Sequence, residues 1–460
     1  MNERSVSYEL SEFVFNLNLR DVPNEVVNKA KMHILDTLGI IMATCELEDV
    51  KPVVNVVRSL GGSPESTVVG QGLKAPAPNA ALANATMAHS VDYDDTHIGA
   101  VVHPSSIIVP TAFAVGEMMD ASGKDILEAV IAGYEVVTRL GLVAPALFHL
   151  RGFHPTGVIG VFGAALVAGK LINLPVEQLT WALGIAGSLA SGIRQAQAEG
   201  VLLKPVHPGF ASHNGIIAAL LAKEGLRGPY MVFEGTQGFF NAFLKGEDID
   251  LKQTTKDLGR RWETINISIK PYPTCHATHS SIDLALILRK KYGIKLEDIE
   301  ECKFFVPRLT IHIVVEPYQE KIAPKTPYAA KFSLPYTVAV AFDRGKVSLW
   351  DFTEDSVKDP KLLKHTPKMK AEHDKKYDGC EGGQVWPARV RVTLRDGTVY
   401  EDEVINHKGT PNNPLTKNEV ISKFNDNIEP SKYRDLGDGI IDMIFNLEKR
   451  NVREVMEVLR

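Results

Sequence analysis

The sequence has little cysteine, no membrane-length apolar run and no recognisable secretion signal. Its four cysteines are scattered without a CxxC pair, which excludes a disulfide framework and a cysteine-rich zinc site. The run "VIGVFGAALVAG" ends at a lysine before it could cross a bilayer. The start, "MNERSVSYELSEFVF", carries charges where a signal peptide would be apolar. We therefore expect a reduced, cytoplasmic protein without a membrane partner.

The chain also lacks an excess of positive charge. Lys and Arg number 51 against 56 Asp and Glu, which gives a formal charge of -5, so no nucleic-acid partner is expected. We find no low-complexity tract and no convincing short-period repeat, so a scaffold role is disfavoured. What is present is ordinary for a globular protein: 460 residues, 44% hydrophobic and 23% charged, enough for two or three domains.

Helical patterns fill the first half of the chain. Between residues 23 and 44, apolar residues recur at helical spacing on roughly one face, at Val26, Ala30, Ile34, Leu38 and Ile41. The segments 124–147, 156–174 and 176–193 are rich in Ala, Gly, Leu and Val. Small side chains let helices approach closely, so these segments predict a buried helical bundle.

From about residue 265 the pattern changes. "CKFFVPRLTIHIVV" favours strand, and "ARVRVTLRDGTVYEDEV" alternates around Asp396-Gly397, which predicts a hairpin. Between them we expect a helix in "KTPYAAKFSLPYTVAVAF" and a polar connector in "KHTPKMKAEHDKKYDG". Thr416 and Glu419 form a capping box that begins the last helices. The prediction is a mainly α protein: a large all-helical domain (1–266 and 409–460) and a smaller α+β domain (267–408) inserted before the C-terminal helices.

The stretch "HSVDYDDTHIGAVVHPSS", residues 89–106, combines three histidines with three aspartates. If the part before Gly99 is helical, Asp92, Asp95 and Thr96 share a face, and Asp94 points elsewhere, solvated or capping. An aspartate beside a neutral histidine can orient it or act as a base. Alternatively the carboxylates pair with neighbouring helices, which we favour for Asp95. Oxygen and nitrogen ligands are available for a metal, but HExxH, HxH and clustered Cys/His spacings are absent, so we expect none.

Three His-Pro steps each precede an apolar helical run, at His103, His154 and His207. Proline favours a helix start directly after the histidine, which places the imidazole beside unsatisfied backbone N–H groups. That environment disfavours a further positive charge, so the histidines should stay neutral and able to accept a proton. The alternative is an exposed cap at each step, but three recurrences favour a shared pocket.

Two lysines stand in apolar surroundings, Lys204 in "GVLLKPVHPG" and Lys270 in "ISIKPYPT". A lysine there is costly to desolvate unless an anion meets it, although its ammonium group can also reach water past its neighbours. Two lysines and three histidines would make a cationic pocket in a net-acidic protein. Such a pocket suits a small polycarboxylate.

At these residues the sequence resembles the MmgE/PrpD family, which contains 2-methylcitrate dehydratase, cis-aconitate decarboxylase and iminodisuccinate epimerase. The matching motifs run in order along nearly the whole chain: "HSVDYDDTH…HPSS", "GFHPTGVIGVFGAA", "GVLLKPVHPGFASHNGIIAALLAKEGLRGP", "KPYPTCHATHSSID", "AAKFSLPYTVA" and "KGTPNNPLTKNEVISKF". The resemblance implies a homodimer, each subunit having a large all-helical domain and a smaller lid with the active site in the cleft between them. It implies neither a cofactor nor a metal.

Carried over by position, the resemblance marks seven active-site residues: Asp92, Thr96, His103, His154, Lys204, Lys270 and Tyr336. Two departures concern the substrate. Cys275 stands where the decarboxylase branch has a histidine, and Val-Val stands before His103-Pro104 where dehydratases usually have Trp-Gly.

The chemistry shared by these enzymes is proton transfer at a carbon next to a carboxylate. For a dehydration, a base removes the α proton while an acid protonates the departing hydroxyl, and fixed positive charge stabilises the intermediate. We assign the base to His103, oriented by Asp92. Lys204 and Lys270 would hold the carboxylates.

Tyr336, with His154, would donate a proton, and Thr96 would position the substrate. The lid residues Lys270 and Tyr336 would reach the substrate only when the cleft closes. The sequence thus favours a cofactor-independent hydro-lyase of the 2-methylcitrate dehydratase type. A decarboxylase of the cis-aconitate type and an epimerase of the iminodisuccinate type remain alternatives. The non-enzymatic alternative is a polycarboxylate-binding protein. The ligand would stabilise such a protein thermally, but the protein would not exchange the α proton of the ligand.

Overall fold

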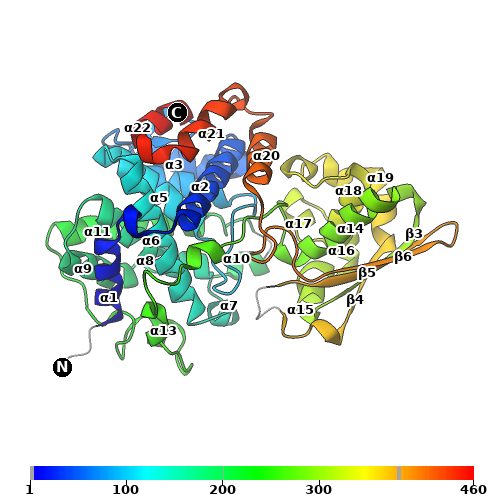
Figure 1. Cartoon of the computed structure of the whole chain (residues 1–460), viewed down its shortest axis with the longest axis horizontal. Coiled ribbons are helices and arrows are strands. Elements are labelled where there is room, and N and C mark those ends of the chain that lie inside the picture. Colours follow the sequence, from blue (N-terminus) through cyan, green and yellow to red (C-terminus); the bar gives the residue numbers. More distant parts are fainter. Residues whose placement is uncertain (1–4, 200, 381–384) are drawn as a thin grey trace. The chain divides into compact units, whose positions relative to one another are not determined.

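The computed structural model describes residues 5–199, 201–380 and 385–460, which form two compact units (Figure 1). Unit 1 comprises Met1–Ser90, Asp94–Ile267 and Thr416–Arg460, and unit 2 comprises Val91–Tyr93 and Ser268–Leu415. Residues 1–4 of the amino-terminal segment and Gly200, which precedes the Lys204 motif, lie outside the described residues. The domain boundaries predicted from the sequence stay a prediction.

Among the described residues of unit 1, the regular secondary structure is helical apart from one short antiparallel ribbon of β1 (Ser66–Val68) and β2 (Leu73–Ala75). Its α-helices are α1 (Val6–Asn16), α2 (Asn24–Thr44), α3 (Lys51–Leu60), α4 (Ala77–His89), α5 (Ser105–Met119), α6 (Gly123–Leu142), α7 (Leu147–Leu150), α8 (Pro155–Leu171), α9 (Val176–Gly187), α10 (Gln195–Ala198), α11 (Val206–Lys223), α12 (Phe239–Phe243), α13 (Lys252–Thr255), α20 (Lys417–Ile428), α21 (Gly437–Phe445) and α22 (Val452–Leu459).

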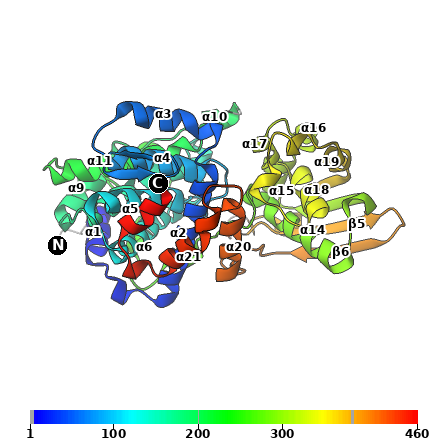
Figure 2. The same ribbon diagram turned by 90° about the horizontal axis from the view of Figure 1, so that it is seen from above.

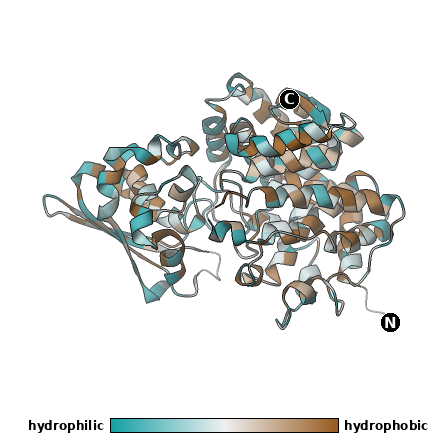
Figure 3. Ribbon diagram, turned by 180° about the vertical axis from the view of Figure 1, so that it is seen from behind, coloured by the Kyte–Doolittle hydropathy of each residue, from teal (hydrophilic) through white to brown (hydrophobic). Residues whose placement is uncertain are grey.

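Helix α8 is central to unit 1, where it packs against α5, α6, α9 and α11. Its closeness to α11 depends on Gly215, where a Cβ would lie only 2.8 Å from the carbonyl oxygen of Val161. Small side chains therefore do bring helices together here, as the composition predicts. Figure 3 shows apolar turns running through the helices of this unit.

The C-terminal helices complete unit 1. Helices α20 and α21 pack against α2, and α22 packs against α5 (Figures 1 and 2). The capping box at the start of α20 is confirmed, since Thr416 Oγ1 accepts from Glu419 N and the Glu419 carboxylate accepts from Thr416 N. The predicted apolar face of α2 is confirmed as well, because each of its five apolar residues is buried.

Unit 2 combines a four-stranded sheet with helices. Its elements are α14 (His279–Tyr292), β3 (Ile299–Val306), α15 (Arg308–Thr310), α16 (Tyr318–Ile322), α17 (Pro327–Ala330), α18 (Leu334–Arg344), α19 (Pro360–His365), β4 (Met369–His373), β5 (Ala388–Leu394) and β6 (Val399–Val404). The strand order is β4-β3-β5-β6, with β3 and β4 parallel and the other two pairs antiparallel. Helices α14 and α18 pack on each other, α14 contacts β5 and β6, and α18 contacts β4.

The mainly α class with a smaller α+β part is confirmed, and so is the β5–β6 hairpin, in which Gly397 has φ +87°. Two local predictions are wrong. The strand predicted over 302–315 ends at Val306, because Pro307 stops it and helical turns follow. The polar connector predicted over 364–379 contains β4. This strand lies at the edge of the sheet and is mostly exposed, so its sequence lacks the apolar alternation that predicts a strand.

None of the helices in the described ranges is both long enough and apolar enough to span a membrane.

Candidate functional site

The segment that carries the first motif is not helical. Helix α4 ends at His89, and residues 90–104 contain turns, bends and bridges but no helix. Asp92 has φ +53°, in the left-handed region that aspartate tolerates better than most residues. The predicted helical face of Asp92, Asp95 and Thr96 is therefore wrong.

Within unit 1, Asp94 is the carboxylate of this segment that lies beside both His89 and His103. Its side chain is fully buried, Oδ2 lies 2.7 Å from His89 Nδ1, and the same oxygen lies 3.7 Å from His103 Nδ1. The sequence predicts Asp94 to be solvated or capping, and this is wrong because the loop folds inward. Neither Asp94 nor His89 is among the predicted site residues, since a run of charges typically indicates a solvated surface.

His103 is held by the same loop. Its Nδ1 lies 2.9 Å from the carbonyl oxygen of Asp95 and 3.1 Å from Thr96 Oγ1. A carbonyl can only accept, so Nδ1 carries a proton, and the nitrogen that can act as a base is Nε2. Asp95 itself binds Ser105 and His33, which fits the interpretation of a structural carboxylate.

Further histidines extend the group into a histidine cluster, which we define as His89, His103, His149, His154 and His207. His154 directly precedes α8, and its Nδ1 lies 3.1 Å from Nδ1 of His207. Ring centroids are 4.8 Å apart for His89 and His103, and 5.5 Å apart for His89 and His154. The expectation that His207 stands ahead of its helix is wrong, since it lies in the first turn of α11.

Three histidines of this cluster, His149, His154 and His207, have lowered pKa values and are therefore neutral. Burial lowers the pKa of His154 well below its ordinary value, and the positive charge of Lys204 lowers it further. Burial likewise lowers the pKa of His207 to about 4 and that of His149 to about 3. The neutrality expected for His154 and His207 is thus found, but burial is its main cause. Neutral bases beside a buried lysine form a suitable environment for an anion.

One nitrogen each from His89, His103 and His154 lie within 4.8 Å of one another, a spacing that a metal ion could use. The charge of Lys204 opposes a cation there, because it acts on the His154 ring. The expectation of no metal stays a prediction.

In unit 2, Lys270 and Asp92 form a buried ion pair. Lys270 Nζ lies 3.0 Å from Asp92 Oδ2 and donates to the Asp92 carbonyl at 2.7 Å, and the lysine is 1% exposed. The Asp92 carboxylate offsets the cost of burying this charge, and the interpretation of a solvent-reaching side chain is wrong for Lys270.

Lys331 is a residue of this region that the sequence does not single out, although it lies in the "AAKFSLPYTVA" motif. Its side chain is buried, and Nζ donates to the carbonyl of Pro273 at 3.1 Å. Burial lowers its pKa to about 7, the charge of Asp92 opposes this, and the charge of Lys270 adds to it. A lysine that titrates near neutrality can transfer protons, and its apolar neighbours in "AA" and "FSLP" are the sequence signal that could have found it.

Tyr336 lies in the core of unit 2. It is fully buried in α18, its hydroxyl donates to the carbonyl of Asp351 at 3.1 Å, and burial raises its pKa. The phenol therefore stays protonated, and its predicted role as a proton donor stays a prediction.

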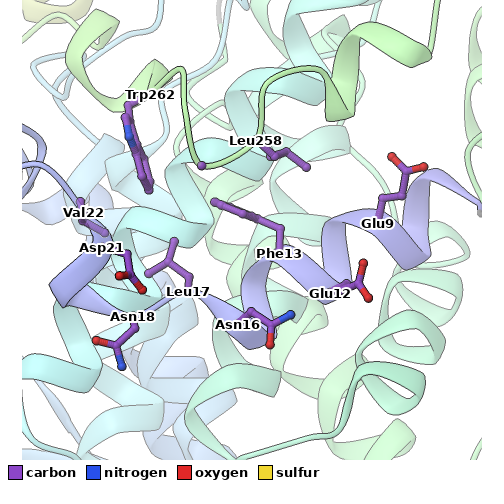
Figure 4. Close-up of a pocket in the computed structure, with 11 residues that line it drawn as sticks. Glu9, Glu12, Phe13, Asn16, Leu17, Asn18, Asp21, Val22, Leu258 and Trp262 are labelled. Carbon is purple, nitrogen blue, oxygen red and sulfur yellow. The ribbon is translucent and has the colours of Figure 1, made fainter.

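A separate pocket lies at the start of unit 1, between α1, the turn 19–21 and residues 258–262 (Figure 4). Phe13 and Trp262 line it, with ring centroids 6.3 Å apart, together with the carboxylates of Glu9, Glu12 and Asp21. Three carboxylates repel a polyanion, so this pocket does not fit the ligand class that the histidine cluster favours.

Comparison with known proteins places this sequence in one family. The model of the MmgE/PrpD N-terminal domain matches residues 8–252, and that of the MmgE/PrpD C-terminal domain matches residues 272–448. The chain belongs to the MmgE/PrpD family.

Curated relatives include lyases of two kinds. A cis-aconitate decarboxylase of Aspergillus terreus is 27% identical over 91% of this chain and 88% of its own length. The cis-aconitate decarboxylase of Homo sapiens is 28% identical over 97% of this chain and 92% of its own length. A mitochondrial 2-methylcitrate dehydratase of Yarrowia lipolytica is 23% identical over 88% of this chain and 80% of its own length.

Proposed function

We propose that this protein is a lyase that acts on a small di- or tricarboxylate by proton transfer at a carbon next to a carboxylate. The observation that carries the proposal is the histidine cluster, in which the neutral imidazoles of His154 and His207 lie with His89 and His103 beside the ammonium group of Lys204. A neutral imidazole can take a proton from carbon, and a fixed positive charge stabilises the carboxylate as negative charge develops.

His103 is the proposed base. Its Nδ1–H is held by the Asp95 carbonyl, which makes Nε2 the proton acceptor, and Thr96 Oγ1 supports the same edge of the ring. Asp94, which pairs with His89, lies 3.7 Å from Nδ1 of His103, and its negative charge stabilises the imidazolium that forms when His103 accepts the proton. In this proposal Asp94 has the orienting role that the sequence analysis assigns to Asp92.

Lys204 and Lys270 are the proposed carboxylate-binding groups. Lys331, whose pKa is about 7, is a proposed acid for the departing group, because a protonated lysine at that pKa releases its proton readily at neutral pH. His154 and Tyr336 keep their predicted roles as further proton donors, although the lowered pKa of His154 leaves its neutral ring without an imidazolium proton to donate.

Dehydration is the reaction that we favour, because it begins with proton abstraction and the cluster consists of proton acceptors. Decarboxylation is the second candidate, supported by the decarboxylase relatives that match over most of their own lengths. Epimerisation would use the same base without a leaving hydroxyl.

The deciding experiment incubates the protein with a panel of tricarboxylates and amino-dicarboxylates in D2O, followed by NMR. Loss of water with a new alkene signal marks a hydro-lyase, release of CO2 marks a decarboxylase, and exchange with a change of optical rotation marks an epimerase. Thermal stabilisation by a panel member without any exchange or turnover would make it a binding protein and overturn the proposal. A His103→Gln variant serves as the inactive control.

The homodimer and the independence of cofactors are also proposed. Light scattering in solution measures the first, and turnover after exhaustive dialysis against EDTA measures the second.

A further inference from the structure

Unit 2 contains a second group of histidines, apart from the residues of the proposed reaction. His276 lies in the short turn 276–278, His279 begins α14, and His407 follows β6. Their ring centroids are 4.7 Å (276 to 279), 5.1 Å (279 to 407) and 5.4 Å (276 to 407) apart. All three are buried, and one ring nitrogen from each lies within 4.8 Å of the others.

Backbone carbonyls fix the tautomers of two of these rings. His279 Nε2 lies 3.2 Å from the carbonyl oxygen of Thr274, and His407 Nδ1 lies 2.9 Å from that of Lys408. Each of these nitrogens must therefore carry the proton that it donates. The remaining nitrogens, Nδ1 of His279 and Nε2 of His407, are buried lone pairs without a hydrogen-bond partner. An imidazole whose N–H binds a carbonyl while the other nitrogen is bare is the usual arrangement of a metal-ligating histidine.

The charges around the group allow a cation. Burial lowers the pKa of His279 well below its ordinary value and that of His407 to about 4, so both rings are neutral and need not lose a proton to bind a metal. Lys270 lowers the pKa of His279 further while Asp92 raises it, and these two residues form the ion pair described above. The positive charge of Lys270 is thus balanced by Asp92.

We propose that His276, His279 and His407 form a binding site for a divalent transition metal, with Zn²⁺ as the preferred ion. Three imidazoles suit zinc, with ligand bonds of about 2.0–2.1 Å, and water can complete the tetrahedron. At such bond lengths the nitrogens lie roughly 3.3 Å apart, so the rings need to move inward by on the order of 1 Å. The ion would join the segment after β6 to the start of α14, a structural role separate from the proposed reaction.

His365 provides a matched control. It is also buried, its Nδ1 donates to the carbonyl of Lys361 at 2.9 Å, and its Nε2 has no partner. It belongs to neither of the three-ligand groups found among the described residues. If a bare buried nitrogen alone attracted zinc, His365 would do so as well.

The test is titration of the EDTA-treated full chain with Zn²⁺ in a calorimeter, and with Co²⁺ followed by its visible ligand-field absorption. We expect one equivalent of each ion, tetrahedral Co²⁺ bands, and at least a tenfold loss of affinity in His279→Gln and in His407→Asn. His365→Gln should bind as the unmodified chain does. Circular dichroism and thermal melting without metal show whether each variant is folded.

The outcomes separate this site from the histidine cluster of unit 1. If the His154→Ala variant still binds one equivalent of Zn²⁺, the proposal is supported. Loss of that equivalent in His154→Ala, with retention in folded His279→Gln and His407→Asn, would move the ion to unit 1 and overturn it. Absence of binding by the unmodified chain at micromolar Zn²⁺ also overturns it. If His279→Gln does not fold, the affinity of folded His407→Asn decides between these outcomes.

Discussion

Nδ1 of His154 and Nδ1 of His207 lie 3.1 Å apart, at hydrogen-bond distance. Because both rings are neutral, one nitrogen donates and the other accepts, so the two rings have opposite tautomers. One ring then presents an Nε2–H donor and the other a basic Nε2. A pair of this kind offers a proton donor and a proton acceptor side by side without any charge.

The pair predicts different results for two substitutions of one residue. In His207→Asn the amide can replace Nδ1 as a partner of His154, so kcat/KM on the substrate found by the panel should fall less than about tenfold. In His207→Ala that partner is lost, and we expect a fall on the order of 100-fold. Equal losses in both variants, measured by steady-state kinetics, would show that the pairing has no role.

Asp94→Asn should reduce kcat/KM by roughly 10²–10⁴ while leaving the fold intact. The amide has nearly the same shape as the carboxylate, but it neither stabilises an imidazolium nor fixes the His89 tautomer. Nitrogen-15 NMR of the histidine rings measures the tautomer directly. Asp283→Asn is the control, because Asp283 is a buried carboxylate of unit 2 that binds Tyr272 and the backbone of Lys408. Near-normal turnover in Asp94→Asn would remove Asp94 from the proposed mechanism.

The Lys270–Asp92 pair predicts strong coupling. Lys270→Met leaves a buried carboxylate without this cation, and Asp92→Asn leaves a buried ammonium group without this anion, so each should reduce the free energy of unfolding by about 3–5 kcal/mol. The double variant should lose clearly less than the sum of the two. Urea unfolding of all four proteins measures the coupling, and additive losses would contradict it.

Lys331 predicts a pH dependence of stability. Its pKa is about 7 in the folded protein against 10.5 when unperturbed, so between these values the unfolded chain holds more protons than the folded one. The contribution of this group to the free energy of unfolding therefore rises with pH across that window, by at most about 1.4 kcal/mol per unit. Below pH 7 both states are protonated and the full cost of burying the charge remains.

Lys331→Met should abolish that slope and stabilise the protein most at pH 7 and below. Urea denaturation at several pH values between 6.5 and 9.5 measures the difference between the two proteins. A difference that does not change with pH would mean that Lys331 keeps its proton when folded.

Much of the fold follows from local patterns. The apolar face of α2, the capping box at Thr416 and the hairpin at Gly397 each depend on residues within one element, and each is confirmed. Strand β4 is different, because its polar residues are exposed and its pairing with β3 is formed by residues 67 positions apart, Cys302 and Met369.

The candidate site is harder to predict from the sequence, because the environment of its charged residues depends on contacts made in the folded protein. Asp94 and Lys331 are charged, and a charged residue in a sequence indicates solvent unless its surroundings in space are known. Family motifs point to His103, His154 and Lys270, but the contact of His89 with Asp94 emerges only from the folded loop. Burial in the folded protein, which residue type alone does not reveal, gives Lys331 and His154 their altered proton affinities.

Because Val91–Tyr93 groups with residues far along the chain, unit 2 is not a segment that can be cut out and moved. The carboxylate that meets Lys270 is supplied from 178 positions earlier in the polypeptide. A clone limited to 268–415 would leave that ammonium group without its native counter-ion. Chimeras between family members must therefore transplant this tripeptide together with the larger piece, or restore an acid for Lys270 by other means.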